Sequence, residues 1–220
     1  MTTPDPRQHT RALAHESLRH NDPIGWFERL YAESAGDMSQ IPWADHEPNP
    51  HLVHLIKQLK SQTLKDQRVI VVGCGLGDDA EYLAQLGAKV TAFDVSPTAI
   101  AWAKKRFPNS PVTYLVADVF TPPSSWHQYF DVVIEIYTIQ ALPHSLRSQV
   151  THAIVDLVRP SGRLVLIARY ASPERSLDGP PWPLTPADIQ MLEAHGFEVE
   201  TKEEARDEQY TRLNAIYKKL

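Results

Sequence analysis

Residues 68–79 read Arg-Val-Ile-Val-Val-Gly-Cys-Gly-Leu-Gly-Asp-Asp, and this stretch decides the fold. Its run of apolar β-branched residues predicts a buried strand, and the alanines and leucines that follow it have helical spacing. The glycines between them, Gly73, Gly75 and Gly77, predict a tight loop that a ligand can approach without meeting a Cβ atom. A strand, a glycine loop and a helix in this order are typical of the first unit of an α/β nucleotide-type site.

The same pattern repeats along the chain. Further strands are expected at residues 89–94, 112–118, 130–137 and 163–169, with helices from about 97 to 107 and from 145 to 158. This alternation predicts a parallel sheet with helices on both faces. After a last helix over 185–195, strands at 197–201 and 209–217 follow each other directly. The end of the chain therefore predicts an antiparallel edge on an otherwise parallel sheet.

Three helices are expected before the first strand, at residues 8–20, 22–35 and 51–59, with a loop at 36–50 that contains Trp43. A chain of 220 residues is long enough for one domain but cramped for two. We therefore expect one domain over residues 1–220. In this interpretation residues 1–60 form a helical cap and a connecting loop, and residues 61–220 form the ligand-binding core.

Composition narrows the function classes. The chain is 42% hydrophobic and 22% charged, as in an ordinary globular protein, and it has no apolar run of the ~20 residues that would span a bilayer. Its net charge of -5 and the absence of a basic block argue against nucleic acid as a partner. A single cysteine, Cys74, indicates a reducing compartment. We expect a cytoplasmic monomer or homodimer that acts on a small molecule.

The residues around the glycine loop point to a specific ligand. The dinucleotide fingerprint ends on a third glycine at the position that Asp78 occupies here, and a carboxylate would repel a diphosphate at the start of the helix. S-adenosylmethionine has no phosphate and carries a cationic amine and a sulfonium. Asp94, at the end of the second strand, is placed to accept hydrogen bonds from two ribose hydroxyls. Asp118, one strand further, is placed to reach the adenine amine.

On these residues the chain resembles the class I S-adenosylmethionine-dependent methyltransferases. The resemblance implies a Rossmann-like doubly wound sheet of seven strands in the order 3-2-1-4-5-7-6, the last strand antiparallel, with N-terminal helices that cover the cofactor site. Short motifs bring it closer to the thiopurine and halide/thiol methyltransferases; they lie at residues 41–43, 117–121, 130–135 and 179–182. That family implies a thiol, a thiopurine-like compound or a halide as methyl acceptor. The fourth strand departs from the family at Glu135 and Gln140.

Methyl transfer is an in-line displacement, so the enzyme chiefly holds the nucleophile, the methyl carbon and the sulfur in line. A thiolate or a halide needs no base, whereas an alcohol or an amine does. Glu135 and Tyr137, expected on one side of the fourth strand, are the candidate catalytic residues. The expected cofactor contacts are Trp26, Trp43, Gly73, Gly75, Gly77, Asp94, Val95, Asp118, Val119 and Glu135. The expected acceptor contacts are Gln140, Arg169 and Trp182, the last in a lid that also includes Tyr170 and Arg175.

Several alternatives stay open at this point. An O- or N-methyltransferase could use Glu135, Tyr137 or His144 as a general base. A protein that binds S-adenosylmethionine without catalysis and a nicotinamide oxidoreductase are further hypotheses, and Asp78 argues against the latter. We expect no metal site, because His51 and His54 are more typical of solvated helix residues than of ligands. We expect Cys74 to pack under the loop rather than to act as a nucleophile.

Overall fold

The computed structural model describes residues 5–59, 64–170, 180–206 and 211–220. They form a seven-stranded sheet in the order β3-β2-β1-β4-β5-β7-β6, as the sequence analysis expected. β7 runs antiparallel to both β5 and β6, and the other neighbouring pairs are parallel. The strands are β1 (Arg68–Val72), β2 (Lys89–Asp94), β3 (Thr113–Val116), β4 (Phe130–Ile136), β5 (Val158–Tyr170), β6 (Phe197–Arg206) and β7 (Thr211–Lys219).

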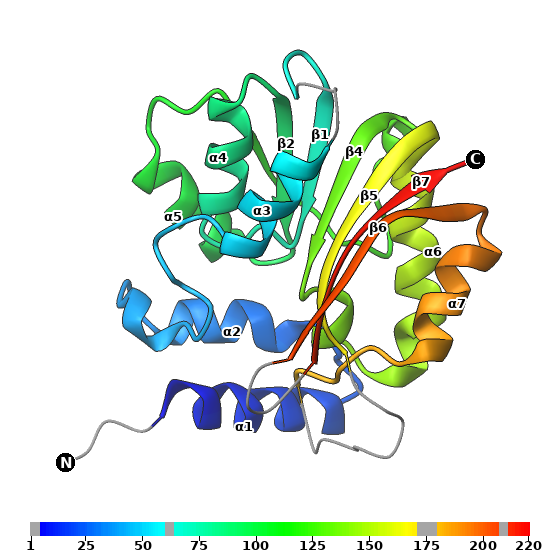
Figure 1. Cartoon of the computed structure of the whole chain (residues 1–220). Coiled ribbons are helices and arrows are strands. Elements are labelled where there is room, and N and C mark those ends of the chain that lie inside the picture. Colours follow the sequence, from blue (N-terminus) through cyan, green and yellow to red (C-terminus); the bar gives the residue numbers. More distant parts are fainter. Residues whose placement is uncertain (1–4, 60–63, 171–179, 207–210) are drawn as a thin grey trace.

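Helices cover both faces of this sheet (Figure 1). Leucines and alanines of α3, α4 and α5 pack with alternate residues of the strands into one apolar cluster. Residues of α6 and α7 pack on the opposite face with the other set of strand residues. The helices are α1 (Pro6–Arg19), α2 (Gly25–Glu33), α3 (Pro50–Gln58), α4 (Asp78–Gln85), α5 (Pro97–Arg106), α6 (Arg147–Leu157) and α7 (Pro186–Ala194), with short 3-10 turns η1 (Met38–Gln40), η2 (Ser124–Trp126), η3 (Ile139–Ala141) and η4 (His144–Leu146).

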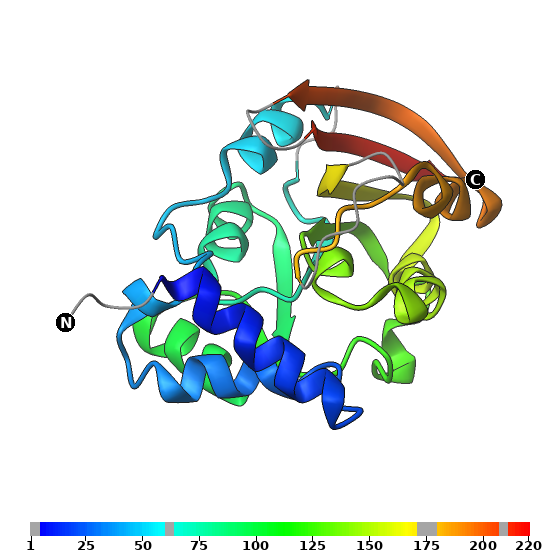
Figure 2. The same cartoon turned by 90° about the horizontal axis from the view of Figure 1, so that it is seen from below.

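The first two helices form a cap over the end of the sheet where the parallel strands finish, as Figures 1 and 2 show from two directions. Leu13 and Ala14 of α1 pack with Trp26, Leu30 and Tyr31 of α2 into a third apolar cluster, which also includes Leu76 of the glycine loop. The apolar face of each helix is thus buried against the other helix and the core, which fixes the cap.

A carboxylate on α2 fastens this cap to the core. Glu28 accepts hydrogen bonds from the Ser96 hydroxyl at 2.5 Å and from the Thr98 hydroxyl at 2.6 Å. It also accepts one from the Thr98 amide at 3.1 Å, in the first turn of α5. A negative charge is favourable there because the first amides of a helix point outward without partners. The sequence pattern did not predict this contact between two distant segments.

Some element boundaries differ from the prediction. The second helix was expected from residue 22, but α2 begins at Gly25, because the side chain of Asp22 accepts a hydrogen bond from the Gly25 amide at 2.8 Å and caps a turn first. The segment after β4 was expected to lead directly into a helix at residue 145, and instead forms η3 and η4 before α6. β5 begins at Val158 rather than at residue 163. Its pairing with β4 shifts register between Phe130 and Val132.

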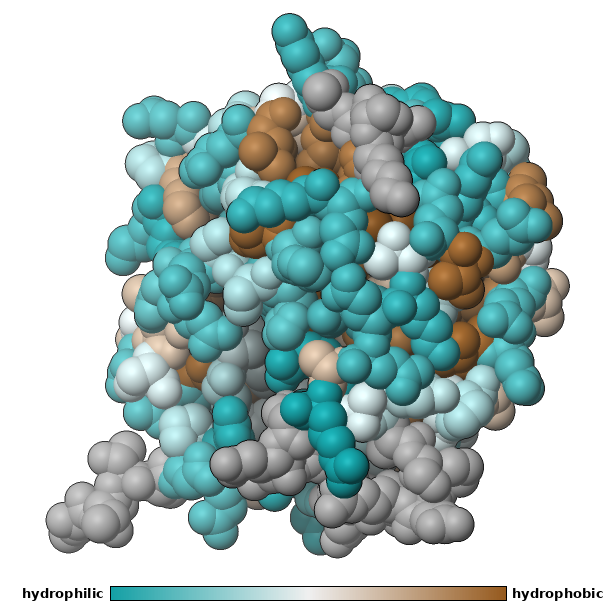
Figure 3. Space-filling view, in the orientation of Figure 1, coloured by the Kyte–Doolittle hydropathy of each residue, from teal (hydrophilic) through white to brown (hydrophobic). Residues whose placement is uncertain are grey.

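The face of the molecule in Figure 3 is mostly hydrophilic, and its apolar residues show in small separate areas. Within the described ranges, no helix combines the length and the hydropathy needed to cross a membrane. The apolar side chains are instead concentrated in the three clusters described above.

Candidate active site

A cavity of about 550 Å³ lies between the cap and the carboxyl ends of the strands. In doubly wound sheets ligands bind outside these strand ends, and small-molecule sites have volumes of ~300–1,000 Å³. Most of the predicted site residues line it: Trp26, Trp43, Gly73, Gly75, Gly77, Asp94, Val95, Asp118, Val119, Tyr137, Gln140 and Arg169. Residues from the beginning, middle and end of the chain therefore meet in one place.

The glycine loop has a left-handed backbone, with φ of 60° at Gly73, 51° at Gly75 and 91° at Gly77. The space beside Gly77, however, is taken by the protein itself. A Cβ atom there would lie 2.4 Å from the hydroxyl of Tyr114 on β3. The third glycine therefore allows close packing of β3 against the loop, in addition to lining the cavity.

Two aspartates follow β2 and β3 at the predicted positions. Asp94 is buried, and its two oxygens accept hydrogen bonds from the amides of Gly75 and Ser96, both at 2.9 Å. Asp118 accepts one from the Phe120 amide at 2.9 Å. Each carboxylate oxygen has a second lone pair, so both side chains can still accept from a nucleoside. Burial raises the pKa of Asp94, while these amide hydrogen bonds lower it.

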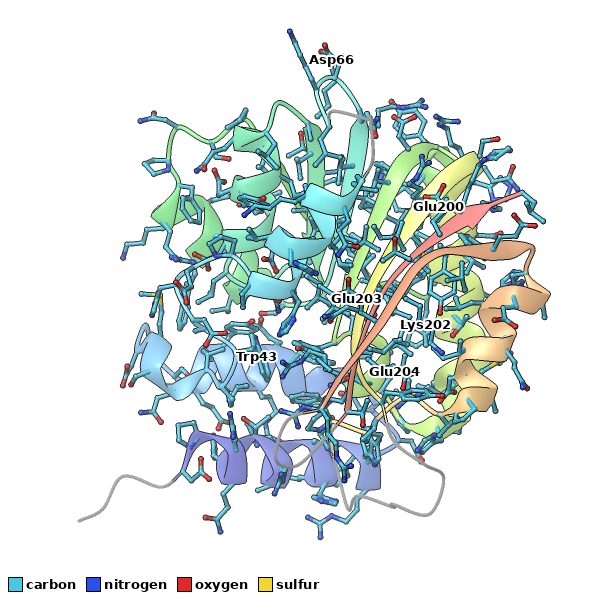
Figure 4. All side chains as sticks on the ribbon, viewed as in Figure 1. Trp43, Asp66, Glu200, Lys202, Glu203 and Glu204 are labelled. Atoms are coloured by element: carbon cyan, nitrogen blue, oxygen red, sulfur yellow. The ribbon has the colours of Figure 1, made fainter. Side chains whose placement is uncertain are left out.

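An aromatic wall stands opposite the glycine loop. The rings of Trp26 and Phe27 stack with centroids 3.8 Å apart, and Trp43 meets Trp26 and Tyr31 edge to face at 6.3 and 6.2 Å. Trp43 donates a hydrogen bond from its indole nitrogen to the Tyr31 hydroxyl at 2.8 Å, and Figure 4 shows it beside α2. Aromatic faces attract a sulfonium cation and stack on adenine.

Asp78 repels a phosphate less in the folded protein than its place in the sequence indicates. Both oxygens of Asp78 accept from the guanidinium of Arg106 at 2.7 Å, so its charge is compensated. Asp79 has no such ion pair in the described hydrogen bonds. Its carboxylate accepts a hydrogen bond from the Asn49 backbone amide at 2.7 Å, and burial raises its pKa to about 6. Asp79 thus ties the segment before α3 to the start of α4.

Glu135 and Tyr137 were expected on one side of β4 but lie on opposite faces. Glu135 is buried, feels the charge of Arg147 on α6, and accepts from the Ile139 amide at 2.8 Å. It is not among the described residues that line the cavity. Tyr137 has a φ of 62°, which breaks the strand alternation and turns its ring toward the cluster under α3. The two proposed catalytic side chains are therefore separated.

The protonated phenol of Tyr137 cannot act as a base, whereas Glu135 is set aside by its position outside the described cavity lining and not by its pKa. Burial raises the pKa of Glu135 to about 7, in spite of the amides of Ile139 and Thr138. Burial also raises the pKa of Tyr137, against the opposite effect of Arg212 and Arg169. The hydroxyl of Tyr137 is within hydrogen-bonding reach of the side chains of Asn49 and Arg212. Tyr137 therefore stays a neutral phenol, suited to orienting a group in the cavity rather than to removing a proton.

At the other end of the cavity, the predicted lid is only partly described. Gln140 is buried. Its side-chain oxygen accepts a hydrogen bond from the Arg169 backbone amide at 2.6 Å, and its backbone carbonyl accepts one from the Trp182 amide at 2.7 Å. Pro180 and Pro181 line the cavity, whereas Trp182 does not occur among the lining residues that the structure describes. Arg175 lies outside the described residues. Tyr170 ends β5 and likewise is not among the described lining residues.

His51 of α3 belongs to a polar group that the sequence pattern did not predict. Nε2 of His51 lies 2.7 Å from a guanidinium nitrogen of Arg212 on β7, and Nδ1 lies 3.1 Å from the side-chain amide nitrogen of Asn214. His51 and Arg212 both line the cavity. The signal was weak, because a histidine at a helix start and an arginine 161 positions later share no motif. His51 is thus part of a network rather than a solvated residue.

The remaining candidates lie elsewhere or are inert. His144 is exposed on η4 and is absent from the described lining of the cavity. Cys74 lines the cavity while packing against the apolar cluster, and burial raises its pKa well above the usual range, so it stays a thiol. Among the residues that the structure describes, no three histidine, cysteine or acidic side chains form a group that could hold a metal ion.

Comparison with known proteins identifies the family. The model of the thiopurine S-methyltransferase family matches residues 33–215. The chain belongs to this family. It is 27% identical to a probable thiol methyltransferase of Arabidopsis thaliana over 198 residues, which cover 87% of this chain and 81% of that protein. It is 30% identical to a 2-heptyl-1-hydroxyquinolin-4(1H)-one methyltransferase of Mycobacteroides abscessus, with 70% and 68% covered.

The fold agrees with the family. The N-methyltransferase NodS of Bradyrhizobium japonicum, solved with S-adenosylhomocysteine, superposes with a TM-score of 0.68 at 18% identity, covering 87% of this chain and 97% of that one. The chain is thus an S-adenosylmethionine-dependent methyltransferase, and the oxidoreductase and the non-catalytic alternatives are set aside. The donor set suits this cofactor, because two carboxylates and an aromatic wall face a cavity opened by glycines. Bound S-adenosylmethionine would supply an electrophilic methyl group on its sulfonium.

Proposed function

We propose that this methyltransferase acts on a small thiol-like acceptor, which reacts as its thiolate. The observation that carries the proposal is the position of Glu135: it is fixed to the Ile139 amide and lies apart from the described cavity lining, while Tyr137 stays protonated. A site with neither residue available as a base suits a nucleophile that arrives ionised. The thiolate would supply the electron pair of the new carbon–sulfur bond, and no proton would then have to move.

Within this proposal the predicted contacts have separate roles. Asp94 and Asp118 would hold the ribose and the adenine, and Trp26 and Trp43 would cover the sulfonium. Tyr137, Gln140 and Arg169 would face the acceptor, because the ends of β4 and β5 follow the glycine loop in the sheet order. Such positioning in a water-poor cavity can contribute up to roughly 10 kcal/mol to lowering the barrier.

The test is a panel of thiols, halides, phenols and amines, assayed for S-adenosylhomocysteine formation. We expect thiols to be methylated fastest. The thiol rate should fall at low pH as the acceptor itself becomes protonated. Faster turnover of a phenol or an amine, with a rate maximum set by an enzyme carboxylate, would contradict the proposal.

One observation favours a second candidate, an O- or N-methyltransferase with a general base. Asp79 lines the cavity and its pKa is raised to about 6, near the value that suits a base at neutral pH. An Asp79→Asn variant separates the candidates. Loss of turnover without loss of S-adenosylmethionine binding, for a phenol or an amine only, would support the second candidate.

We also propose that the chain works as one domain on a small molecule. Residues 1–60 would form the cap and the connecting loop, and residues 61–220 the core; this boundary falls in a stretch outside the described residues. The cavity volume suits a small acceptor, and the net charge of -5 gives no attraction for nucleic acid. A cytoplasmic monomer or homodimer agrees with the single cysteine. Sedimentation measurements with and without cofactor would test the oligomeric state.

A further inference from the structure

Two prolines form an apolar part of the cavity lining. Pro180 is buried, Pro181 is half-buried, and both line the cavity. The cofactor's nucleoside would lie at Asp94 and Asp118, which follow β2 and β3 on one side of the glycine loop in the sheet order. A surface on the other side of the loop, toward β4 and β5, is left for the acceptor.

Backbone hydrogen bonds place the prolines at that other side. The Trp182 amide donates to the Gln140 carbonyl, just after β4, at 2.7 Å. The Leu184 amide donates to the Arg169 carbonyl on β5 at 2.8 Å. Proline has no amide hydrogen, so the two prolines cannot form bonds of this kind themselves. The proline wall, residues 180 and 181, therefore depends on contacts made by the residues that follow it.

Arg147, the first residue of α6, holds Trp182 through a further contact. Its guanidinium donates a hydrogen bond to the Trp182 carbonyl at 2.5 Å, so both the amide and the carbonyl of Trp182 are bound. The side chain of Arg147 is only 3% exposed, and Arg147 is not among the described residues that line the cavity. Its effect on the cavity would therefore pass through Trp182.

Two carboxylates attract the buried guanidinium. Asp188, in the first turn of α7, lies 3.7 Å from Nη1, and the charge of Glu135 on β4 also acts on Arg147. Among the described residues, Nε and Nη1 of Arg147 and Oε2 of Glu135 have no hydrogen-bond partner. A buried ion pair adds little stability over apolar side chains of similar size. Stability alone therefore does not account for an arginine at this position.

We propose that Arg147 is a positioning residue for the methyl acceptor: it fixes the Trp182 carbonyl and thereby holds the proline wall in the shape that binds the acceptor. The inference rests on the proposed function for the place of the acceptor, but not for the atom that is methylated. A flat apolar ring would pack on the wall. Because a wall that is already ordered costs less to bind against, loss of Arg147 weakens acceptor binding rather than methyl transfer.

The test uses three variants of Arg147 in the whole chain. Arg147→Met has a long side chain without charge or donors, and Arg147→Lys can still donate to the Trp182 carbonyl. Removal of the arginine charge raises the pKa of Glu135 further above its value of about 7, so Glu135 takes up a proton instead of staying an unpaired charge. Arg147→Gln, which is neutral but polar, replaces the methionine variant if that variant does not fold.

Arg106→Met is the matched control. Arg106 donates to the Leu76 carbonyl at 2.8 Å and pairs with Asp78 at 2.7 Å, so it also joins a backbone carbonyl to a carboxylate. It too is absent from the described lining of the cavity. Its contacts lie at the glycine loop, on the cofactor's side. The control should therefore weaken S-adenosylmethionine binding about tenfold and leave the KM for the acceptor nearly unchanged.

Thiophenol, phenol and aniline are the acceptor probes, because they share one ring and differ in the nucleophilic atom. At saturating S-adenosylmethionine, Arg147→Met should raise KM about tenfold for each probe that is methylated and leave kcat nearly unchanged. Arg147→Lys should restore most of this loss, and neither variant should change the Kd for S-adenosylmethionine. A merely structural role would reduce the amount of active enzyme, which lowers kcat without moving KM.

Hydrogen exchange measures the wall without an acceptor. In residues 180–184 only Trp182 and Leu184 have amide hydrogens, because the other three are prolines. With S-adenosylhomocysteine bound, both amides should exchange at least tenfold faster in Arg147→Met than in the wild type. In Arg147→Lys and Arg106→Met they should exchange nearly as in the wild type.

The outcomes separate this inference from the proposed function. Unchanged exchange in Arg147→Met, or an unchanged KM for every probe that is methylated, would overturn the inference even if thiophenol is the best acceptor. Conversely, faster methylation of phenol or aniline would contradict the thiol acceptor. A rise in KM for that probe in Arg147→Met would still support the positioning role.

Discussion

The carboxylate of Asp94 accepts a hydrogen bond from the amide of Gly75 at 2.9 Å, which joins the end of β2 to the glycine loop of β1. One side chain thus shapes the loop and faces the cavity. The contact explains why a buried carboxylate persists here: backbone amides at Gly75 and Ser96 replace the water it has lost.

Asp94→Ala should weaken S-adenosylmethionine binding at least tenfold, because it removes both the acceptor oxygens and the support of the loop. In free energy, tenfold is about 1.4 kcal/mol. Calorimetry on the folded variant measures this, with Asp94→Asn as the comparison that keeps one acceptor oxygen. An unchanged affinity in Asp94→Ala would exclude Asp94 as a ribose contact.

Glu135→Gln should retain most of the methyl transfer rate, because glutamine can still accept from the Ile139 amide. Burial raises the folded-state pKa of Glu135 to about 7, so the folded protein binds this proton more tightly than the unfolded chain does. Stability should therefore fall as pH rises from about 4.5 to 7, and this fall should be smaller in the variant. Thermal unfolding at pH 5 and pH 8 measures the difference. A rate loss of a hundredfold or more would show that methyl transfer depends on the Glu135 carboxylate and would contradict this prediction.

The stability that Asp131 contributes to the fold should have the opposite pH dependence. Burial alone would raise its pKa, but hydrogen bonds from Arg68 and Arg159 lower it to about 2. Its stabilising contribution is present above the unfolded pKa of about 3.9 and is lost as pH falls toward 2. Asp131→Asn should cost about 1–3 kcal/mol at pH 7 and progressively less below pH 4. Urea unfolding of both proteins from pH 7 to pH 3 tests this, and a constant difference would refute it.

Gly77→Ala should destabilise the fold by more than the same substitution at another glycine with a left-handed backbone and open space around it. The residue has a φ of 91°, and its Cβ atom would lie 2.4 Å from the Tyr114 hydroxyl. Gly36 has a φ of 93° with nothing within 4 Å, so Gly36→Ala is the matched control. We expect the control to lose about 1–2 kcal/mol and Gly77→Ala clearly more. Equal losses in the two variants would mean that Tyr114 moves aside without cost.

Local patterns in the sequence were enough to predict the alternation of strands and helices, the glycine loop and the two strand-end aspartates. These patterns are local because hydrophobic periodicity, the conformational freedom of glycine and helix capping each depend on residues that are close together in the sequence. They also placed Tyr137, Gln140 and Arg169 near the cavity, since the ends of parallel strands meet at one edge of a sheet. The order of the strands came from family resemblance, and the tertiary structure confirms it.

Only the tertiary structure determines which side chains that are distant in the sequence are in contact. It compensated Asp78 with Arg106, turned Tyr137 away from Glu135 through a φ of 62°, and brought His51 next to Arg212 across 161 positions. None of these contacts repeats with a helix or strand period, so no local pattern encodes them. They arise because buried charges and polar groups must find partners wherever packing places them, and that placement belongs to the whole fold.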